Sequence, residues 1–298
     1  AFATAPQAPA ASAADGFASA FGANPFDTPA AAPGGASAER GLTPAQEQQA
    51  SAWYRAAVLR GGETPDALPL MDDGTLQVVL KCEFRGSQGR LTVQYRNVAP
   101  SAVTNLRVEL ENPESFLRYE IQAGPPGLAP GASAAQQIMV ECMRPCAESP
   151  ALVFCYTDGL GAVRARARLP VLMASFNEPL TMSAADYETR WAALVQPGQE
   201  VIEHLTLAAP PDAARLGAVL STAMRFGAVA PAQPPFPGDA LLLGAATLRT
   251  GSLASNGEKI NVGCLVKLEL ASSGAGRLTV RALLPAAARP AAALIKHH

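Results

Sequence analysis

Few residues in this 298-residue chain have the type and spacing that enzyme chemistry requires. The only histidine outside the C-terminal pair is His204. It follows Val201 and Ile202 in a segment whose spacing favours a helix, so a surface or packing role is expected. A Ser-His-Asp triad needs a positioned histidine, and no Gly-rich phosphate loop with a following Lys and Ser or Thr occurs. We therefore expect no catalytic residue and no cofactor.

The cysteines favour neither a metal site nor a disulfide framework. They are five in number and form no C-x-x-C pair, whereas zinc sites usually take four nitrogen or sulfur ligands. Buried, reduced thiols in a cytosolic protein are the simplest interpretation. The residues concerned are Cys82, Cys142, Cys146, Cys155 and Cys264.

The overall composition excludes several classes of partner. The formal net charge is −2, which gives no general attraction to nucleic acid or to an anionic membrane. No apolar run approaches the ~20 residues of a membrane span. The chain begins with Ala1 and has no basic segment before an apolar one, so no signal peptide is expected and a fragment of a longer polypeptide is indicated.

The most distinctive stretch is SAADYETRWAALV at residues 183–195. Ser183 can cap a helix, with Asp186 at the capping-box position. Tyr187 and Trp191 continue into Leu194 and Val195 as one stripe of a 3.6-residue period. By periodicity alone, such a stripe is typical of a helix packed on a core. The alternative is that Trp191 floors a shallow docking site.

Short alternating segments before this helix predict strands. A hairpin turn at Asp158-Gly159 and three arginines on one face, Arg164, Arg166 and Arg168, support this pattern. The spacing of about 8–12 residues between the strands is typical of an immunoglobulin-like β-sandwich. The expected strands cover 76–84, 90–97, 103–110, 116–121, 137–142, 151–156 and 163–172, preceded by a helix at 43–59.

The period changes after residue 179, and a mixture of helices and antiparallel strands is expected. Helices are predicted at 183–195, 199–207 and 285–296, and strands at 240–250, 260–270 and 277–284, with 213–220 left open and a loop at 231–237. The fold class is therefore a β-sandwich subdomain followed by an α+β platform subdomain. We expect a flexible hinge at 1–42, the sandwich at 43–176 and the platform at 177–298.

The hinge is rich in Ala and Pro, a composition that stays extended because it buries little apolar area. It contains Asn24, Pro25 and Phe26, a tripeptide that favours a turn presenting one aromatic ring. This tripeptide is either a chance occurrence or a short linear motif that docks an EH domain of a partner.

Several stretches occur in an order that resembles one known family. They are LKCEFRGSQGRLTVQYRN, QQIMVEC, ADYETRWAALVQPGQEV, INVGCLVKLEL and GRLTVR. Together they are similar to the appendage of the α-adaptin large subunit of the plasma-membrane clathrin adaptor complex. The most specific patterns lie at 190–201 and 263–269, and the resemblance covers residues 49–284.

The resemblance implies a non-enzymatic hub. Such appendages bind short Asp-Pro-Phe, Asp-Pro-Trp or Phe-x-Asp-x-Phe motifs in endocytic accessory proteins. It also implies a cytoplasmic location at clathrin-coated pits, and other adaptor subunits bound through an N-terminal trunk. An appendage of a related vesicle coat is the alternative. A sandwich that binds sugar or carries out hydrolysis would instead need a deep polar pocket.

The resemblance also implies site residues. On the platform, the family tryptophan matches Trp191, and we expect its indole edge to be packed and one face exposed. A flanking phenylalanine of the family falls at Glu188, which removes an apolar wall and adds a negative charge. The polar positions match Lys267, Glu269, Arg277 and Arg281, with lysine in place of an arginine at the first. The family's second site, on the sandwich, matches Lys81 and has Gln94 at its phenylalanine position.

Overall fold

A computed structural model describes residues 39–61, 67–207, 209–230 and 239–296. The first element is helix α1, Pro44–Leu59, and Thr43 is its N-cap. Pro44 fits the first turn because its missing N–H would have no helical partner there. The Thr43 backbone N–H donates to Gln46 Oε1 (2.8 Å), so Gln46 completes the capping box while Glu47 lies in the acidic first turn.

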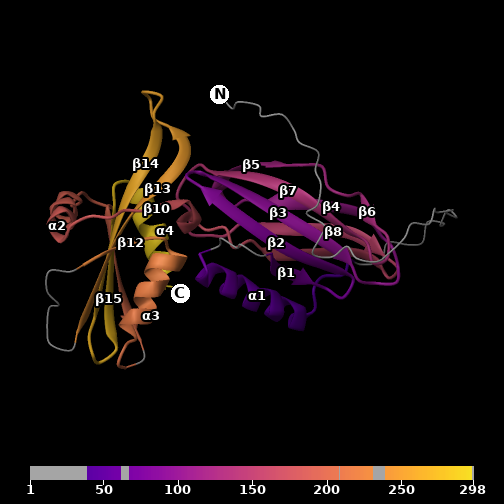
Figure 1. Cartoon of the computed structure of the whole chain (residues 1–298), viewed down its shortest axis with the longest axis horizontal. Coiled ribbons are helices and arrows are strands. Elements are labelled where there is room, and N and C mark those ends of the chain that lie inside the picture. Colours follow the sequence, from indigo (N-terminus) through magenta and orange to yellow (C-terminus); the bar gives the residue numbers. More distant parts are fainter. Residues whose placement is uncertain (1–38, 62–66, 208, 231–238, 297–298) are drawn as a thin grey trace. The chain divides into compact units, whose positions relative to one another are not determined.

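Nine strands follow and form two antiparallel sheets (Figure 1). One sheet has the order β1-β2-β3-β7-β5 and the other β6-β4-β8-β9. The strands are β1 Leu68–Asp72, β2 Leu76–Arg85, β3 Gln88–Asn97, β4 Val103–Glu111, β5 Leu117–Ile121, β6 Gly127–Leu128, β7 Ser133–Cys142, β8 Ala151–Asp158 and β9 Gly161–Arg168, with a short turn η1 Pro113–Ser115 before β5.

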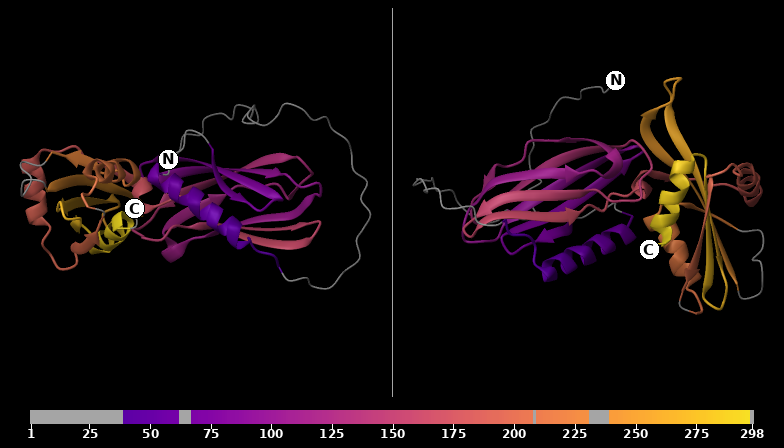
Figure 2. Two further views of the ribbon diagram at one scale, coloured as in Figure 1. Left: turned by 90° about the horizontal axis from the view of Figure 1, so that it is seen from below. Right: turned by 180° about the vertical axis from the view of Figure 1, so that it is seen from behind.

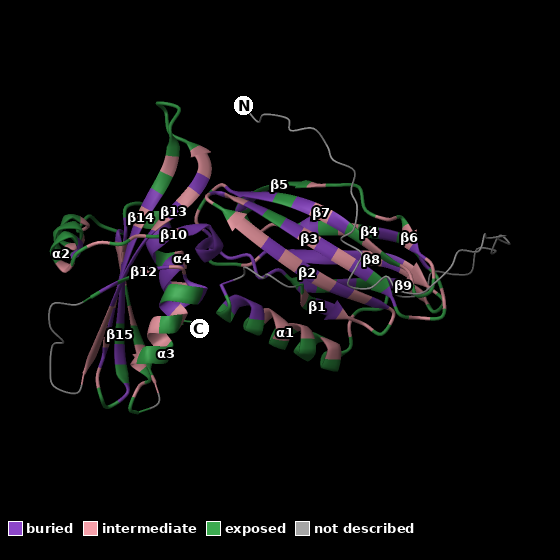
Figure 3. Ribbon diagram, viewed as in Figure 1, coloured by how far each residue is buried: buried purple, intermediate pink, exposed green. Residues whose placement is uncertain are grey.

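The alternation of apolar and polar residues explains why the two sheets pack face to face. Along β2, every second residue from Leu76 to Cys82 is buried and the residues between them are half-buried (Figure 3), as expected for strands with one face on a core. Tyr95 and Phe154 join the sheets through an edge-to-face contact with ring centroids 6.3 Å apart. Figure 2 shows the two layers from two further directions. The predicted β-sandwich is confirmed.

The rest of the chain forms a third antiparallel sheet with the order β10-β13-β14-β15-β11, and β12 also pairs with β13. Figure 1 shows α2 on one face of this sheet, and α3 and α4 on the other. The elements are η2 Met173–Phe176, β10 Asn177–Pro179, α2 Ala184–Ala193, β11 Glu200–Thr206, α3 Ala213–Ala218, η3 Val219–Ala223, β12 Gly227–Val229, β13 Ala240–Leu253, β14 Lys259–Leu270, β15 Ala275–Ala282 and α4 Pro285–Lys296. The predicted α+β platform is confirmed.

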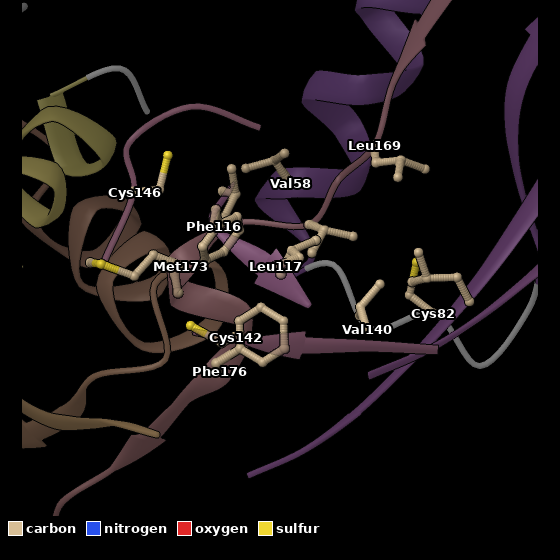
Figure 4. Packing of buried hydrophobic residues seen from close by; sticks show 14 of the residues in the cluster. Val58, Cys82, Phe116, Leu117, Val140, Cys142, Cys146, Leu169, Met173 and Phe176 are labelled. Atoms are coloured by element: carbon tan, nitrogen blue, oxygen red, sulfur yellow. The ribbon is translucent and has the colours of Figure 1, made fainter. Parts of the chain in front are cut away.

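The hydrophobic core continues from the sandwich into this platform. Phe176 of η2 packs edge-to-face against Phe84 (5.3 Å) and Phe116 (5.9 Å). Figure 4 shows Phe116, Phe176 and Met173 in this region, together with Cys142. One cluster of buried residues includes both Leu80 of β2 and Leu268 of β14, so a single core spans the two parts. The division at residue 176 stays a prediction.

One predicted helix is wrong. Residues 199–207 were expected to be helical, but Glu200–Thr206 is strand β11 and pairs with β15 over its whole length. The apolar residues Val201, Ile202 and Leu205 fit a helical stripe, whereas Val201 and Leu205 also fit a strand face. Pairing with β15 satisfies the backbone donors and acceptors of β11 and decides between the two. His204 therefore lies on a strand, where it is exposed.

Other differences concern the ends of strands and short strands. The strand predicted at 163–172 ends at Arg168, two residues before Pro170, which has no N–H to donate to a ladder. The short strands β1, β6, β10 and β12 were not predicted. They have five residues or fewer, too few for an alternation to stand out.

All five cysteines are free, and four of them are buried. Burial raises the pKa of Cys142 and of Cys264 to about 12. Cys155 is half-buried on β8. The predicted burial is confirmed for four of the five thiols, and Cys155 is the most accessible of them.

Candidate peptide-binding site

The face of the platform sheet that carries α2 is built from alternate residues of neighbouring strands. Across β14 and β15, Leu265 lies opposite Arg281, Lys267 opposite Thr279, and Glu269 opposite Arg277. Since side chains alternate along a strand, these residues share one face. Leu265 belongs to the same apolar cluster as Tyr187 of α2, which identifies the face.

Helix α2 lies over this face because its start is capped and its inner side is aromatic. Ser183 Oγ accepts from the Asp186 backbone N–H (3.1 Å). Tyr187 is fully buried, and its hydroxyl donates to the Val266 carbonyl (2.8 Å). Burial raises the pKa of this tyrosine well above its usual value, so the hydroxyl stays a donor. Tyr187 thereby holds the helix on strand β14.

Trp191 is half-buried and stacks on Tyr187, with ring centroids 5.5 Å apart and an angle of 18° between the rings. The Arg281 guanidinium carbon lies 4.4 Å from the centre of the indole. The Trp191 ring therefore has two close neighbours, one aromatic and one cationic. An indole held in this way presents its remaining surface in a fixed position.

Arg281 connects three parts of the site. Its Nη1 donates to the Trp191 carbonyl (2.5 Å), and its Nε donates to Glu200 Oε2 of β11 (2.7 Å). Its side chain is only 17% exposed. The fold thus uses this guanidinium to position Trp191, which leaves little of it for a ligand. The carbonyl contact crosses 90 residues of sequence, so spacing could not reveal it.

Lys267 and Arg277 are the more accessible cations, and both lie near Glu269. Lys267 Nζ is 3.5 Å from Glu269 Oε1, and Arg277 Nη1 is 3.9 Å from Glu269 Oε2. The Arg277 side chain is 52% exposed, and that of Lys267 is 30% exposed. These separations are long for charge-assisted hydrogen bonds, so a ligand carboxylate can compete with Glu269 for both cations.

Two residues beyond the predicted set lie on the same face. Ile202 of β11 pairs with Thr279, and His204 pairs with Arg277. Ile202 is 40% exposed, and His204 is exposed. They were not predicted, because the sequence pattern of this segment favoured a helix. The alternation of Glu200, Ile202 and His204 along β11 is the signal that could have found them.

Glu188 is exposed on α2. Burial raises the pKa of Tyr187, and the charge of Glu188, the next residue along the helix, adds to that effect. The structure thus brings the predicted platform residues together at one face of the sheet. Strands β14 and β15 contribute Lys267, Glu269, Arg277 and Arg281, and α2 contributes Glu188 and Trp191.

The sandwich residues are also placed by the sheet register. Lys81 of β2 lies opposite Thr92, and Gln94 lies two residues further along β3. Both are half-buried on the outer face, where Lys81 Nζ is 3.3 Å from Glu83 Oε1. Asn24, Pro25 and Phe26 lie outside the described residues.

Two features of other protein classes are absent from the described part of the chain. No group of three or more His, Cys, Asp or Glu side chains is arranged there to hold a metal ion. None of the described helices is long and apolar enough to cross a membrane.

Comparison with known proteins finds adaptins among the proteins similar to this chain. The sequence model of the adaptin C-terminal domain matches residues 66–165. AP-2 complex subunit alpha-2 of Dictyostelium discoideum is 31% identical over 143 residues, covering 48% of this chain and 14% of that protein. AP-2 complex subunit alpha-1 of Arabidopsis thaliana is 29% identical over 154 residues, covering 51% of this chain and 15% of that protein. The chain thus spans about one seventh of the length of these curated relatives.

Residues 66–165 match the adaptin C-terminal domain family, and over about half of the chain the resemblance to the α-adaptin appendage is confirmed. Among solved structures, the GAE domain of GGA2p from Saccharomyces cerevisiae matches with 15% identity and a TM-score of 0.32, covering 36% of this chain and 97% of that one.

Proposed function

We propose that this chain is the appendage of a clathrin adaptor, and that its platform binds short aromatic-acidic peptide motifs of the Asp-Pro-Phe or Asp-Pro-Trp kind. The observation that carries the proposal is the position of Trp191. The indole is half-buried over Tyr187 and fixed by Arg281, and Lys267 and Arg277 stand on the same sheet face.

The chemistry of such a motif fits these groups. A phenylalanine or tryptophan ring gains from stacked or edge-to-face contact with an indole. The motif's aspartate can draw Lys267 and Arg277 away from Glu269, because both existing contacts are 3.5 Å or longer. The contact area is small, so each motif binds weakly. Tight recruitment then depends on several motifs in one partner.

The wider role is also part of this proposal. The division at residue 176 gives a β-sandwich subdomain followed by the platform, with the segment before residue 43 as a hinge. Accessory proteins of endocytosis are the proposed partners, and the other adaptor subunits join through a preceding trunk. The protein then acts at the cytoplasmic side of the plasma membrane, in clathrin-coated pits, as a binding module rather than an enzyme.

Titration calorimetry with Asp-Pro-Phe and Phe-x-Asp-x-Phe peptides tests this function. We expect weak binding that is lost in Trp191→Ala. Tyr119→Ala is a matched control, because Tyr119 is a 44% exposed aromatic on the sandwich strand β5. Circular dichroism of both variants checks that they fold. Absence of binding to a broad panel of such peptides would overturn the proposal.

A second site on the sandwich is proposed at Lys81 and Gln94. These residues share an outer face, and the lysine offers one cation to an acidic motif. With glutamine at the aromatic position, this site has no ring to stack on. We therefore expect it to bind more weakly than the platform, and Lys81→Ala to leave platform binding unchanged.

A further inference from the structure

The charges around Trp191 are not all paired. Lys267 and Arg277 share Glu269, and Arg281 is paired with Glu200 at 2.5 Å. Three cations thus face two carboxylates within the sheet. Glu188 adds a third carboxylate from α2, and within the described part of the chain it makes no ion pair or hydrogen bond. The formal charges of these six side chains sum to zero.

Glu188 is also isolated along its own helix. Side chains three and four residues apart are neighbours on a helix surface. For Glu188 these neighbours are Ala184, Ala185, Trp191 and Ala192. None of them is charged, and three have only a methyl group. No charged neighbour on its own helix face therefore offsets the carboxylate, which is three residues from Trp191.

The path of α2 shows which way Glu188 faces. The segment before α2 is tied to β13, where the Leu180 N–H donates to the Ala245 carbonyl (3.0 Å). The end of α2 is tied to β15 through Arg281 and the Trp191 carbonyl. The helix therefore crosses the strands, starting beside β13 and ending beside β15.

Helical geometry then puts Glu188 and Trp191 on one side. Tyr187 points into the sheet. Viewed along the helix axis, Trp191 is rotated from Tyr187 by about 40°, and Glu188 is rotated from it by about 100° in the same direction. On a right-handed helix running in this direction, that side overhangs the Lys267 end of β14 rather than its Gly263 end. Arg190 is turned by about 60° in the opposite sense and cannot neutralise Glu188.

From this arrangement we infer that the platform site selects motifs with a basic residue beside the aromatic anchor, and that Glu188 is the residue that selects it. The inference rests on the proposed function and adds the charge pattern of the ligand. A purely acidic motif meets repulsion from Glu188 as its ring reaches Trp191. A lysine or arginine next to the ring turns that repulsion into attraction, while the aspartate still reaches Arg277.

Four short peptides test the inference in the whole chain. All four contain Asp-Pro-Phe. Two of them have a lysine, either one or two positions after the phenylalanine, and the other two have glutamine in place of that lysine. An exposed ion pair predicts that the better lysine peptide binds about two- to fivefold more tightly than its glutamine counterpart. The advantage should decrease as salt is raised, because exposed charges are screened.

The variants at residue 188 give the reciprocal test. Glu188→Gln should abolish the lysine advantage, and Glu188→Lys should reverse it. Glu120→Gln is the matched control, since Glu120 is an exposed glutamate on β5 of the sandwich, and it should leave the advantage unchanged.

The outcomes separate the two proposals. If all peptides bind through Trp191 but lysine and glutamine peptides bind equally, the inference is overturned and the proposed function stands. The inference is also overturned if Glu188→Gln leaves the lysine advantage unchanged. If no peptide binds, the proposed function is overturned and the inference with it.

Discussion

Arg281→Lys tests how the site is held together. Lysine keeps the positive charge near Glu200 but loses the planar guanidinium over Trp191 and the fork that reaches both Glu200 and the Trp191 carbonyl. A hydrogen bond from a charged group contributes about 1.5–3 kcal/mol, and an exposed cation–π contact about 0.5–1 kcal/mol. Because lysine retains part of each, we expect a loss of about 1–3 kcal/mol in the free energy of unfolding.

Urea unfolding followed by the emission of Trp191 measures this loss. A Trp53→Phe background leaves Trp191 as the only tryptophan. Arg277→Lys is the matched control, since its side chain is 52% exposed and its nearest partner, Glu269, is 3.9 Å away. We expect that control to change stability by less than about 0.5 kcal/mol. Peptide affinity should fall about fivefold for each 1 kcal/mol of positioning lost.

The reasoning is refuted if Arg281→Lys is no more destabilising than Arg277→Lys and the emission of Trp191 is the same in both. Arg281 would then be a surface cation, and the position of the indole would depend on Tyr187 alone.

Four further predictions concern other residues of the chain. Tyr187→Phe keeps the ring stack but removes the donor to the Val266 carbonyl, so unfolding in urea should show a loss of about 1–2 kcal/mol. Gly251→Ala puts a methyl group 2.3 Å from the Glu141 carboxylate, which pairs with Arg118 and Lys259. This substitution should lower the unfolding temperature. Gly263→Ala is the control and should leave the unfolding temperature unchanged, because a methyl group there has open space. Burial raises the pKa of Cys264 to about 12, so between about pH 8.5 and 12 the unfolded chain releases a proton that the folded chain keeps. The free energy of unfolding should therefore fall as pH rises, by up to about 1.4 kcal/mol per pH unit from this residue. In Cys264→Ala the decrease with pH should be less steep. An EH domain should retain the chain in a pull-down, and Phe26→Ala should abolish retention, whereas equal retention of both would assign Asn24-Pro25-Phe26 no role.

Much of the fold could be predicted because its signals are local. Alternation along 76–84 and 90–97 needs only one buried face, and the structure has β2 and β3 there. Caps at Thr43 and Ser183 identify the starts of α1 and α2. Strand β11 was missed because Val201, Ile202 and Leu205 satisfy two periods at once, and only its pairing with β15 decides between them.

The candidate site could be predicted in part, because some of its signals are also local in the sequence. Strand periodicity puts Lys267 and Glu269 on one face, and a resemblance to known appendages identifies Trp191. The function of Arg281 could not be derived, because it depends on a contact with the backbone of a helix far away in the sequence. His204 was missed together with β11. Glu188 was predicted to add a negative charge, but the pairing of the neighbouring cations with Glu269 and Glu200 could be seen only in the structure.

Titration of isotope-labelled protein with an Asp-Pro-Phe peptide, followed by NMR, tests the central claim most directly. The chain has two tryptophans, so the indole N–H signals of Trp53 and Trp191 act as control and reporter. We predict that the Trp191 indole signal moves together with the backbone amides of Lys267 and Arg277, while the Trp53 signal stays fixed. Movement at Trp53 or at Gln94, with Trp191 unchanged, would contradict the account.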